Sequence, residues 1–189
     1  MDRFTVFFDA NIFFSAAQTD LVMELYLQGL FRAKWSYRVH QEWITALLRE
    51  KPHLLLESLE KRRDMMNQNA GDCLVTGFET TIESLTLPDP DDRHVLAAAI
   101  HAGAGLIVTS NLKNFPKETL SSYGIQAQSL DNFVIDLFDL NYKAVLKAAK
   151  LHRAKLKNPP KDQYEYLESL DRQGLLQFVN ALEEYLGFF

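Results

Sequence analysis

The stretch that decides the fold is LPDPDDRHVLAAAIHAGAGLIVTSNLKNFP, residues Leu87–Pro116. Its Ala-rich part predicts a helix over residues 91–102, and the apolar run that follows predicts a buried strand over residues 106–109. A helix that leads into a buried strand is typical of the βαβ units of α/β proteins. Three acids crowd into four residues at the start of this helix: Asp89, Asp91 and Asp92.

The first 130 residues alternate short apolar runs with amphipathic segments. The runs predict strands at residues 5–8, 33–35, 82–87, 106–109 and 125–128. Helices are predicted between them, at residues 20–30 (capped by Thr19 or Asp20), 36–49 (capped by Ser36), 53–69 and 91–102. This order predicts an α/β fold with a parallel sheet of about five strands, flanked by helices.

The character of the chain changes to all helix after about residue 130. A long amphipathic helix is predicted over residues 131–153, and Pro159-Pro160 breaks the pattern. Asp162 and Glu165 form a capping box for the next helix. We therefore expect two units, residues 1–130 and a helical extension over residues 131–189.

Composition limits the class of protein. Nearly half of the 189 residues are hydrophobic, which is enough for a sizeable core, but no run of about 18 apolar residues predicts a membrane span. The first residues lack the apolar stretch of a signal peptide. Cys73 is the only cysteine, so we expect it to be inert in a reducing, cytoplasmic setting. The net charge of −5 argues against coating nucleic acid by bulk attraction, but it does not exclude a nuclease.

Polar residues follow three of the predicted strands. Asp9 ends the first strand, the three acids follow the third, and Thr109, Ser110 and Asn111 follow the fourth. The carboxyl ends of parallel strands meet at one edge of a sheet, where ligands bind. Converging carboxylates must either protonate or share a cation, and hard ions such as Mg²⁺ or Mn²⁺ prefer oxygen ligands. Such a site suits phosphodiester hydrolysis.

Ordinary structural roles compete with this interpretation. Acids before a helix stabilise its N-terminus, so Asp89 and Asp91 are read first as helix-start residues. Arg93 either contacts a phosphate or is a surface helix residue. His94 is read as a packed or solvent-facing imidazole, because metal-assisted hydrolysis does not require one.

Four fragments together resemble the PIN-domain ribonucleases, in the branch of bacterial toxin–antitoxin toxins. They are FDANIFFSA, HQEWITALL, LPDPDDRHVLAAAIHAGAGLIVTSN and LKNFP, in this order along roughly residues 4–130. The resemblance implies an α/β/α sandwich with an acidic Mg²⁺ or Mn²⁺ site that cleaves RNA. It also implies an antitoxin partner and suggests a homodimer.

The resemblance assigns site residues by position. Asp9, Glu42 and Asp92 match the family's three acids, which bind metal and catalyse hydrolysis. Asn11 matches the polar residue that helps to hold the site. Thr109 or Ser110 matches the small hydroxyl residue that lies beside the metals.

The chain departs from the family pattern at two positions. Many members carry Asp where this chain has Asn111, and some place an acid where it has Asn114. An amide offers a carbonyl oxygen or a hydrogen bond, but it supplies no charge. A second metal would then bind more weakly, and a catalytically weak or inactive protein that binds RNA or a partner is the alternative function.

A phosphate-transfer domain of the receiver or haloacid-dehalogenase type also places Asp at the end of its first strand. The dehalogenase pattern requires a second Asp where this chain has Asn11. The receiver pattern requires paired acids before the first helix and a Lys after a late strand, and neither is apparent.

The extension carries its own pattern. Lys143, Lys147, Lys150 and Lys157 fall near helical spacing, so they form either a solvated helix face or a stripe that follows an RNA backbone. The terminal sequence GLLQFVNALEEYLGFF is too apolar for a free tail. We expect it to pack on the domain or to form a dimer or antitoxin surface.

Overall fold

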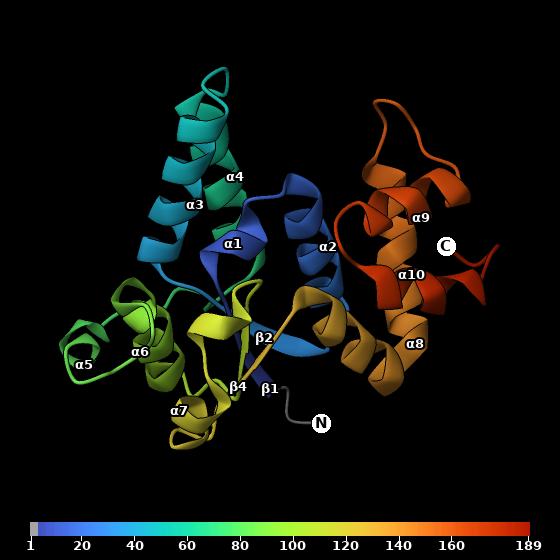
Figure 1. The fold of residues 1–189 in the computed structure, drawn as a ribbon. Coiled ribbons are helices and arrows are strands. Elements are labelled where there is room, and N and C mark those ends of the chain that lie inside the picture. The colour runs from blue at the N-terminus through green and yellow to red at the C-terminus, as the bar shows by residue number, and fades with distance from the viewer. Residues whose placement is uncertain (1–3) are drawn as a thin grey trace.

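The computed structural model describes residues 4–189, and its centre is a parallel sheet (Figure 1). Within the described residues the sheet has four strands in the order β2-β1-β3-β4. They are β1 (Phe4–Phe8), β2 (Phe31–Lys34), β3 (Leu106–Val108) and β4 (Gln126–Gln128). Every pairing is parallel. The α/β class with a parallel sheet is therefore confirmed, with four strands in place of about five.

The strand predicted over residues 82–87 is wrong. This part of the chain continues from a short helix, α5 (Glu79–Ile82), into irregular backbone. Leu85 and Leu87 are buried without joining the sheet. The open side of β2 is taken instead by residues near Leu74, because the N–H of Trp35 donates to the Cys73 carbonyl and the N–H of Val75 donates to the Trp35 carbonyl.

Helices fill the connections between the strands. Between β1 and β4 these are α1 (Ala10–Phe13), α2 (Ala16–Leu27), α3 (Tyr37–Glu50), α4 (Leu56–Asn69), α5, the 3₁₀ turn η1 (Pro90–Asp92), α6 (Arg93–His101), the 3₁₀ turn η2 (Leu112–Asn114) and α7 (Lys117–Ser121). The extension adds α8 (Leu130–Lys155), α9 (Gln163–Asp171) and α10 (Leu176–Glu183). Helix α6 packs against β1 and β3, and α2 packs against β2 and α8.

Local capping explains most helix starts. The Ser36 hydroxyl accepts the Val39 N–H at the start of α3, and Asp162 forms the predicted capping box with Glu165. Helix α2 begins earlier than predicted, since Ser15 rather than Thr19 or Asp20 is its cap. The Thr19 hydroxyl instead donates to backbone carbonyls of the preceding turn.

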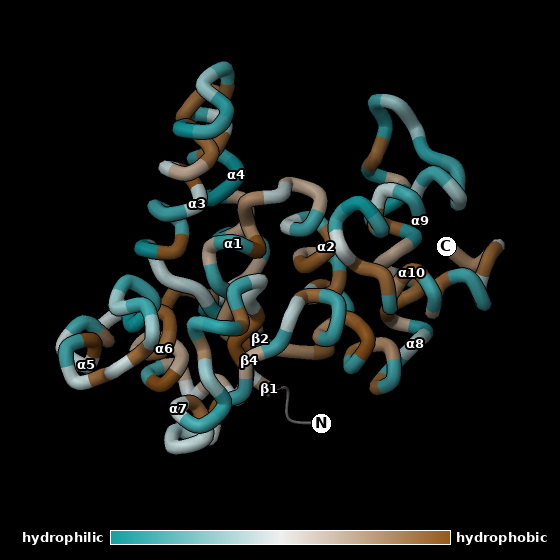
Figure 2. Tube along the Cα trace, in the orientation of Figure 1, coloured by the Kyte–Doolittle hydropathy of each residue, from teal (hydrophilic) through white to brown (hydrophobic). Residues whose placement is uncertain are grey.

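The hydrophobic core runs from the sheet into the extension, as the brown segments of Figure 2 show. The ring centroid of Phe133 from α8 lies 5.1 Å from that of Phe31 and 5.7 Å from that of Phe8, and both contacts are edge-to-face. Such aromatic pairs are favourable beyond their buried area. The first turns of α8 are thereby fixed to β1 and β2.

Polar contacts fix the rest of the extension. Helix α8 is kinked at Asn141, and beyond the kink Lys155 forms an ion pair with the buried Glu24 of α2. The Asp131 carboxylate accepts the N–H groups of Gln177 (2.9 Å) and Phe178 (3.0 Å) at the start of α10. The apolar terminal segment thus packs on the extension, while a division of the chain at residue 130 stays a prediction. None of the helices between residues 4 and 189 is long and apolar enough to cross a membrane.

Candidate active site

Asp9 lies at the carboxyl end of β1, and only 4% of its surface is exposed. Its Oδ2 accepts hydrogen bonds from the Thr109 hydroxyl (2.7 Å) and the Asn11 amide (2.6 Å). Its Oδ1 accepts the N–H of Ala10 (2.6 Å), which also caps α1. Three donors from two neighbouring strand ends therefore fix the orientation of one buried carboxylate.

The ionisation of Asp9 is opposed by its surroundings. Burial raises the pKa of its carboxyl above the usual value, and the hydrogen bonds from Thr109 and Ala10 only partly offset this. The charges of Asp92 and Glu42 raise the pKa further. The acids that the sequence placed together thus act on one another in the folded chain.

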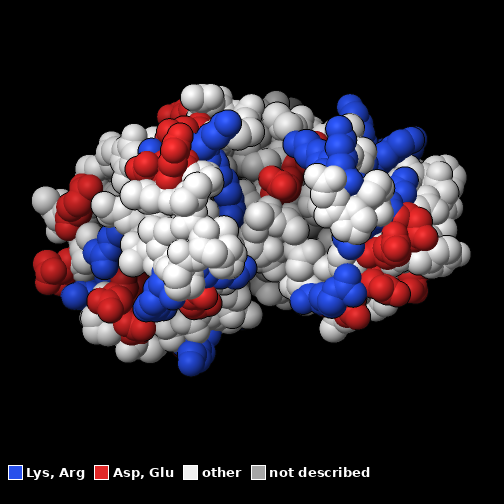
Figure 3. Space-filling view, turned by 90° about the horizontal axis from the view of Figure 1, so that it is seen from above, with Lys and Arg blue, Asp and Glu red and all other residues white. Residues whose placement is uncertain are grey.

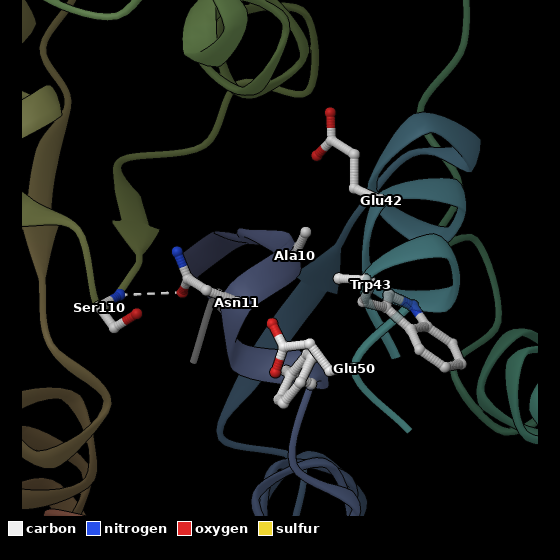
Figure 4. Close-up of a pocket in the computed structure, with 8 residues that line it drawn as sticks. Ala10, Asn11, Glu42, Trp43, Glu50 and Ser110 are labelled. Atoms are coloured by element: carbon white, nitrogen blue, oxygen red, sulfur yellow. Dashed lines mark hydrogen bonds between the residues drawn. The ribbon is translucent and has the colours of Figure 1, made fainter. Parts of the chain in front are cut away.

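The residues after β3 form a network around Asn11. The Asn11 amide donates to the Thr109 hydroxyl oxygen (3.1 Å), and its carbonyl accepts the N–H of Ser110 (2.9 Å; Figure 4). The hydroxyl beside the first acid is therefore that of Thr109, because Ser110 is exposed and contributes its backbone. The Asn111 N–H donates to Thr109 (3.0 Å), but its side chain makes no hydrogen bond within residues 4–189.

Asp92 is the last residue of η1, directly before α6. Its Oδ2 accepts the side-chain amide of the buried Asn114 (2.7 Å). Burial is the largest effect on the pKa of the Asp92 carboxyl and raises it. The hydrogen bond from Asn114 and the nearby His94 lower this pKa, whereas the charges of Asp89 and Glu42 raise it. Position 114 therefore holds an amide that supports Asp92.

Glu42 reaches the site from α3. Its Oε1 lies 2.8 Å from Nε2 of His94 on α6 and 3.3 Å from Nε of Arg38, one turn earlier on α3. The His94 side chain is buried, as one of the two sequence-based readings expected. The sequence analysis missed the contact between His94 and Glu42. It also missed the ion pair between Arg38 and Glu42, although their four-residue spacing is a signal for it.

The other candidates near η1 have structural contacts. An Asp89 oxygen accepts the N–H of Asp91 (3.0 Å) and caps η1, while the Asp91 side chain is exposed. Arg93 donates to the Pro90 carbonyl (2.9 Å). Asp89 and Asp91 therefore occupy the helix-start positions expected of them, and Asp89 also acts on the charge of Asp92.

Asp9, Glu42 and Asp92, which we call the carboxylate site, come from three separate elements. Among residues 4–189, no group of three or more His, Cys, Asp or Glu side chains is drawn together closely enough to form a ready-made metal cage. The donor chemistry nevertheless fits a hard cation. Oδ1 of Asp92 and Oε2 of Glu42 accept no hydrogen bond within the described chain, and positive charge would relieve the mutual repulsion.

A hollow of about 430 Å³ adjoins this site between α1 and α3, and we call it the α3 hollow (Figure 4). It is lined by Ala10, Asn11, Phe14, Glu42, Trp43, Ala46, Glu50 and Ser110. Trp43 is held in place, because its Nε1 donates to Nδ1 of His40 (3.0 Å) and Arg62 lies 4.6 Å from its ring centroid. Sequence reasoning missed Glu50, which lies about two turns after Glu42 on the same helix.

A model described as "PIN domain" matches residues 5–113, more than half of the chain. The chain belongs to the PIN domain family. A second model, described as "VapC50 C-terminal domain", matches residues 130–184 of this PIN protein.

One relative of this PIN protein is named "Putative ribonuclease VapC50" and comes from Mycobacterium tuberculosis (strain ATCC 25618 / H37Rv). The two chains are 42% identical over 83 residues, which is 43% of this chain and 48% of the relative. The match thus spans about half the length of that relative. No solved structure matches the chain.

Proposed function

We propose that this PIN protein is a ribonuclease that hydrolyses RNA phosphodiester bonds with the help of Mg²⁺ or Mn²⁺. The observation that carries the proposal is the buried Asp9 carboxylate, whose pKa is raised by burial and further by Asp92 and Glu42. Such an arrangement is costly in a protein without a cation, and perturbed carboxylates of this kind concentrate at functional sites. The name of the mycobacterial relative supports the same activity.

Asp9, Asp92 and Glu42 would hold the metal, directly or through water. A bound divalent ion supplies positive charge that neutralises these acids and stabilises negative charge on the reacting phosphate. The acids would also keep the metal close to the α3 hollow, because Glu42 belongs to both.

The protein's own side chains do the positioning. Thr109 and Asn11 fix the direction of the Asp9 carboxylate, and Asn114 fixes that of Asp92. His94 engages Oε1 of Glu42, which would leave Oε2 free to accept a hydrogen bond from the attacking water and so orient it. Such pre-set groups contribute to catalysis because little reorganisation is needed during the reaction.

The α3 hollow fits an RNA base next to the scissile phosphate. The half-buried Phe14 offers apolar contact, and the buried Trp43 supports the wall of the hollow from behind. The Glu50 carboxylate can accept hydrogen bonds from the amino groups of a base but repels a phosphate. Single-stranded RNA is commonly recognised in this way, by splayed bases against aromatic and polar side chains.

The biological role that we propose is that of the toxin in a toxin–antitoxin pair, acting in the cytoplasm. The sequence resemblance to the toxin branch supports this role, and so does the match of the extension to a domain that bears the VapC50 name. An antitoxin protein and a second copy of the chain are the partners proposed with it.

The decisive experiment is the cleavage of a mixed RNA pool by purified protein with Mn²⁺, with Mg²⁺ and with chelator. We expect cleavage to require metal and to fall at least about a hundredfold in Asp9→Asn and in Asp92→Asn, a size typical of lost electrostatic groups. Asp91→Asn is the matched control, since its exposed side chain has no place in the site. Undiminished cleavage in chelator, or by Asp9→Asn, would reject the proposal.

A catalytically inactive PIN protein is the second candidate. Asn111 and Asn114 favour it, because both replace acids that relatives carry and leave less charge for a second metal. Folded, antitoxin-free protein that binds RNA but cuts none of the pool with either metal would select this candidate.

A further inference from the structure

A second hollow, of about 550 Å³, lies on the extension and uses none of the residues of the carboxylate site. We call it the lysine groove. It is lined by Tyr142, Lys143, Leu146, Lys147, Lys150, Glu184, Tyr185 and Phe188. The second half of α8 forms one wall, and the end of α10 with the residues after it forms the other.

The lysines of the groove are exposed and free to bind an anion. Lys143, Lys147 and Lys150 follow one another by four and three residues, so they share one face of α8. None of the three forms an ion pair with any residue between 4 and 189, whereas Lys155 on the same helix is paired with Glu24. Figure 3 shows Lys and Arg in more than one group on the lobe formed by the C-terminal helices, with Asp and Glu between them.

Aromatic rings accompany these charges. Tyr142 and Tyr185 lie with ring centroids 5.6 Å apart, and Phe188 lies 6.3 Å from Tyr185. Tyr142 is 41% exposed and Phe188 is 68% exposed. The Lys143 ammonium lies 5.9 Å from the Tyr142 ring centroid, so a cation and an aromatic face are offered side by side. Aromatic surface of this kind is not used for the core.

We propose that the lysine groove binds a single-stranded segment of RNA. The three ammonium groups would neutralise successive phosphates, and Tyr142 and Phe188 would stack on the bases between them. Single-strand binding sites combine a positive groove with such stacking platforms, and they tolerate many sequences because every base has a π face. An acidic protein surface would use the charges but would not need exposed rings beside them.

The inference rests on the proposed function in one respect, which is that RNA is the substrate. The groove would hold a part of the RNA that is distant from the cut, so it would add affinity and leave the chemistry unchanged. Binding can therefore be measured without cleavage.

The test is the fluorescence anisotropy of a short labelled single-stranded RNA, with full-length protein carrying Asp9→Asn so that no cutting interferes. Lys143→Gln, Lys147→Gln and Lys150→Gln together should weaken binding about tenfold or more, and should reduce the slope of log affinity against log salt by about two. Tyr142→Leu with Phe188→Leu should weaken binding and leave that slope unchanged. Thermal melts of each variant show whether the fold is kept.

The matched control removes three lysines that do not line the groove, with Lys61→Gln, Lys117→Gln and Lys157→Gln. Lys157 was expected on the same helical stripe, but it lies beyond the end of α8 at Lys155. Equal weakening by this control would mean that only overall charge matters, which overturns the proposal. The proposal is also overturned if the groove variants bind RNA as tightly as the parent protein. The same holds if these variants keep their RNA affinity but no longer bind an acidic protein partner. RNA binding that depends on the groove, in a protein whose wild type cuts nothing, would support this inference while rejecting the ribonuclease.

Discussion

The side-chain amide of Asn114 donates a 2.7 Å hydrogen bond to the carboxylate of Asp92. The two residues are 22 positions apart in the chain, and their hydrogen bond joins η2 to η1. The amide at this position is therefore a support for one acid of the carboxylate site, and its replacement by an acid changes both the hydrogen bond and the charge.

Asn114→Asp should destabilise the metal-free protein and strengthen its response to metal. The new carboxylate would face Oδ2 of Asp92, so a hydrogen bond is lost and a repulsion is added. The loss of an anchoring donor costs about 1–3 kcal/mol. Urea unfolding in chelator and in Mn²⁺ measures both effects. Asn114→Ala is the control, because it loses the bond without adding charge. Equal responses to Mn²⁺ in the two variants would contradict the expectation.

Divalent metal should stabilise the wild-type protein through the carboxylate site. At a free concentration of a hundred times Kd, binding to the native state alone adds about 2.7 kcal/mol to the free energy of unfolding. Thermal melts with and without Mn²⁺ should therefore shift for the wild type and for Asp91→Asn, but hardly for Asp9→Asn. A full shift in Asp9→Asn would place the metal elsewhere.

Asp92→Asn should leave the metal-free protein at least as stable as the wild type near neutral pH. The raised pKa of Asp92 means that the folded chain resists its ionisation, so the stability gained by protonation is present below the ordinary pKa of 3.8 and is lost as the pH rises through the folded value. The amide keeps an oxygen for Asn114 and removes the charge. Urea unfolding in chelator at pH 7 measures the change. An unfolded variant would show that Asp92 acts mainly as a helix-start residue.

Two buried histidines should lower the stability of the protein as the pH falls, whereas the contribution of Asp92 is lost as the pH rises. Burial lowers the pKa of His40 and of His152 from 6.5 to about 4. The unfolded chain therefore takes up protons first, and the stability present above pH 6.5 is lost as the pH falls toward 4, by up to about 3 kcal/mol for each group. Unfolding free energies at pH 7 and pH 4.5 measure the loss.

His152→Gln isolates one of these contributions. The Tyr166 hydroxyl forms a 2.8 Å hydrogen bond with Nδ1 of His152, and burial raises the pKa of that hydroxyl. Glutamine can form a hydrogen bond with the hydroxyl without titrating. The variant should lose less stability between pH 7 and pH 4.5 than the wild type, and an identical loss would assign the acid sensitivity to other groups.

The parts of the fold that were predictable from the sequence are those encoded locally. Ser36 and the Asp162 capping box start the helices where expected, because a cap depends on residues three positions apart. The strand predicted at 82–87 failed for the opposite reason. Its apolar residues are buried, but whether they pair with a sheet edge depends on competition with the segment around Leu74, which no local pattern reports.

The carboxylate site divides in the same way. Asp9 and Thr109 follow from the rule that ligand sites lie beyond the carboxyl ends of parallel strands. The pairing of Glu42 with His94 did not follow, because it depends on how α3 and α6 face each other across the site. The Asn114 hydrogen bond to Asp92 likewise joins two turns whose proximity only the folded chain defines.

Helix α8 begins two residues after β4, and the Gln128 carbonyl at the end of β4 accepts the N–H of Thr109 (2.9 Å), the residue whose hydroxyl binds Asp9. The extension is thus joined to the sheet by folded backbone beside the carboxylate site, without a loose tether. If the carboxylate site and the lysine groove both bind RNA, the folded connection would hold the two sites at a fixed separation. The cut would then fall at a set number of nucleotides from the segment bound by the extension.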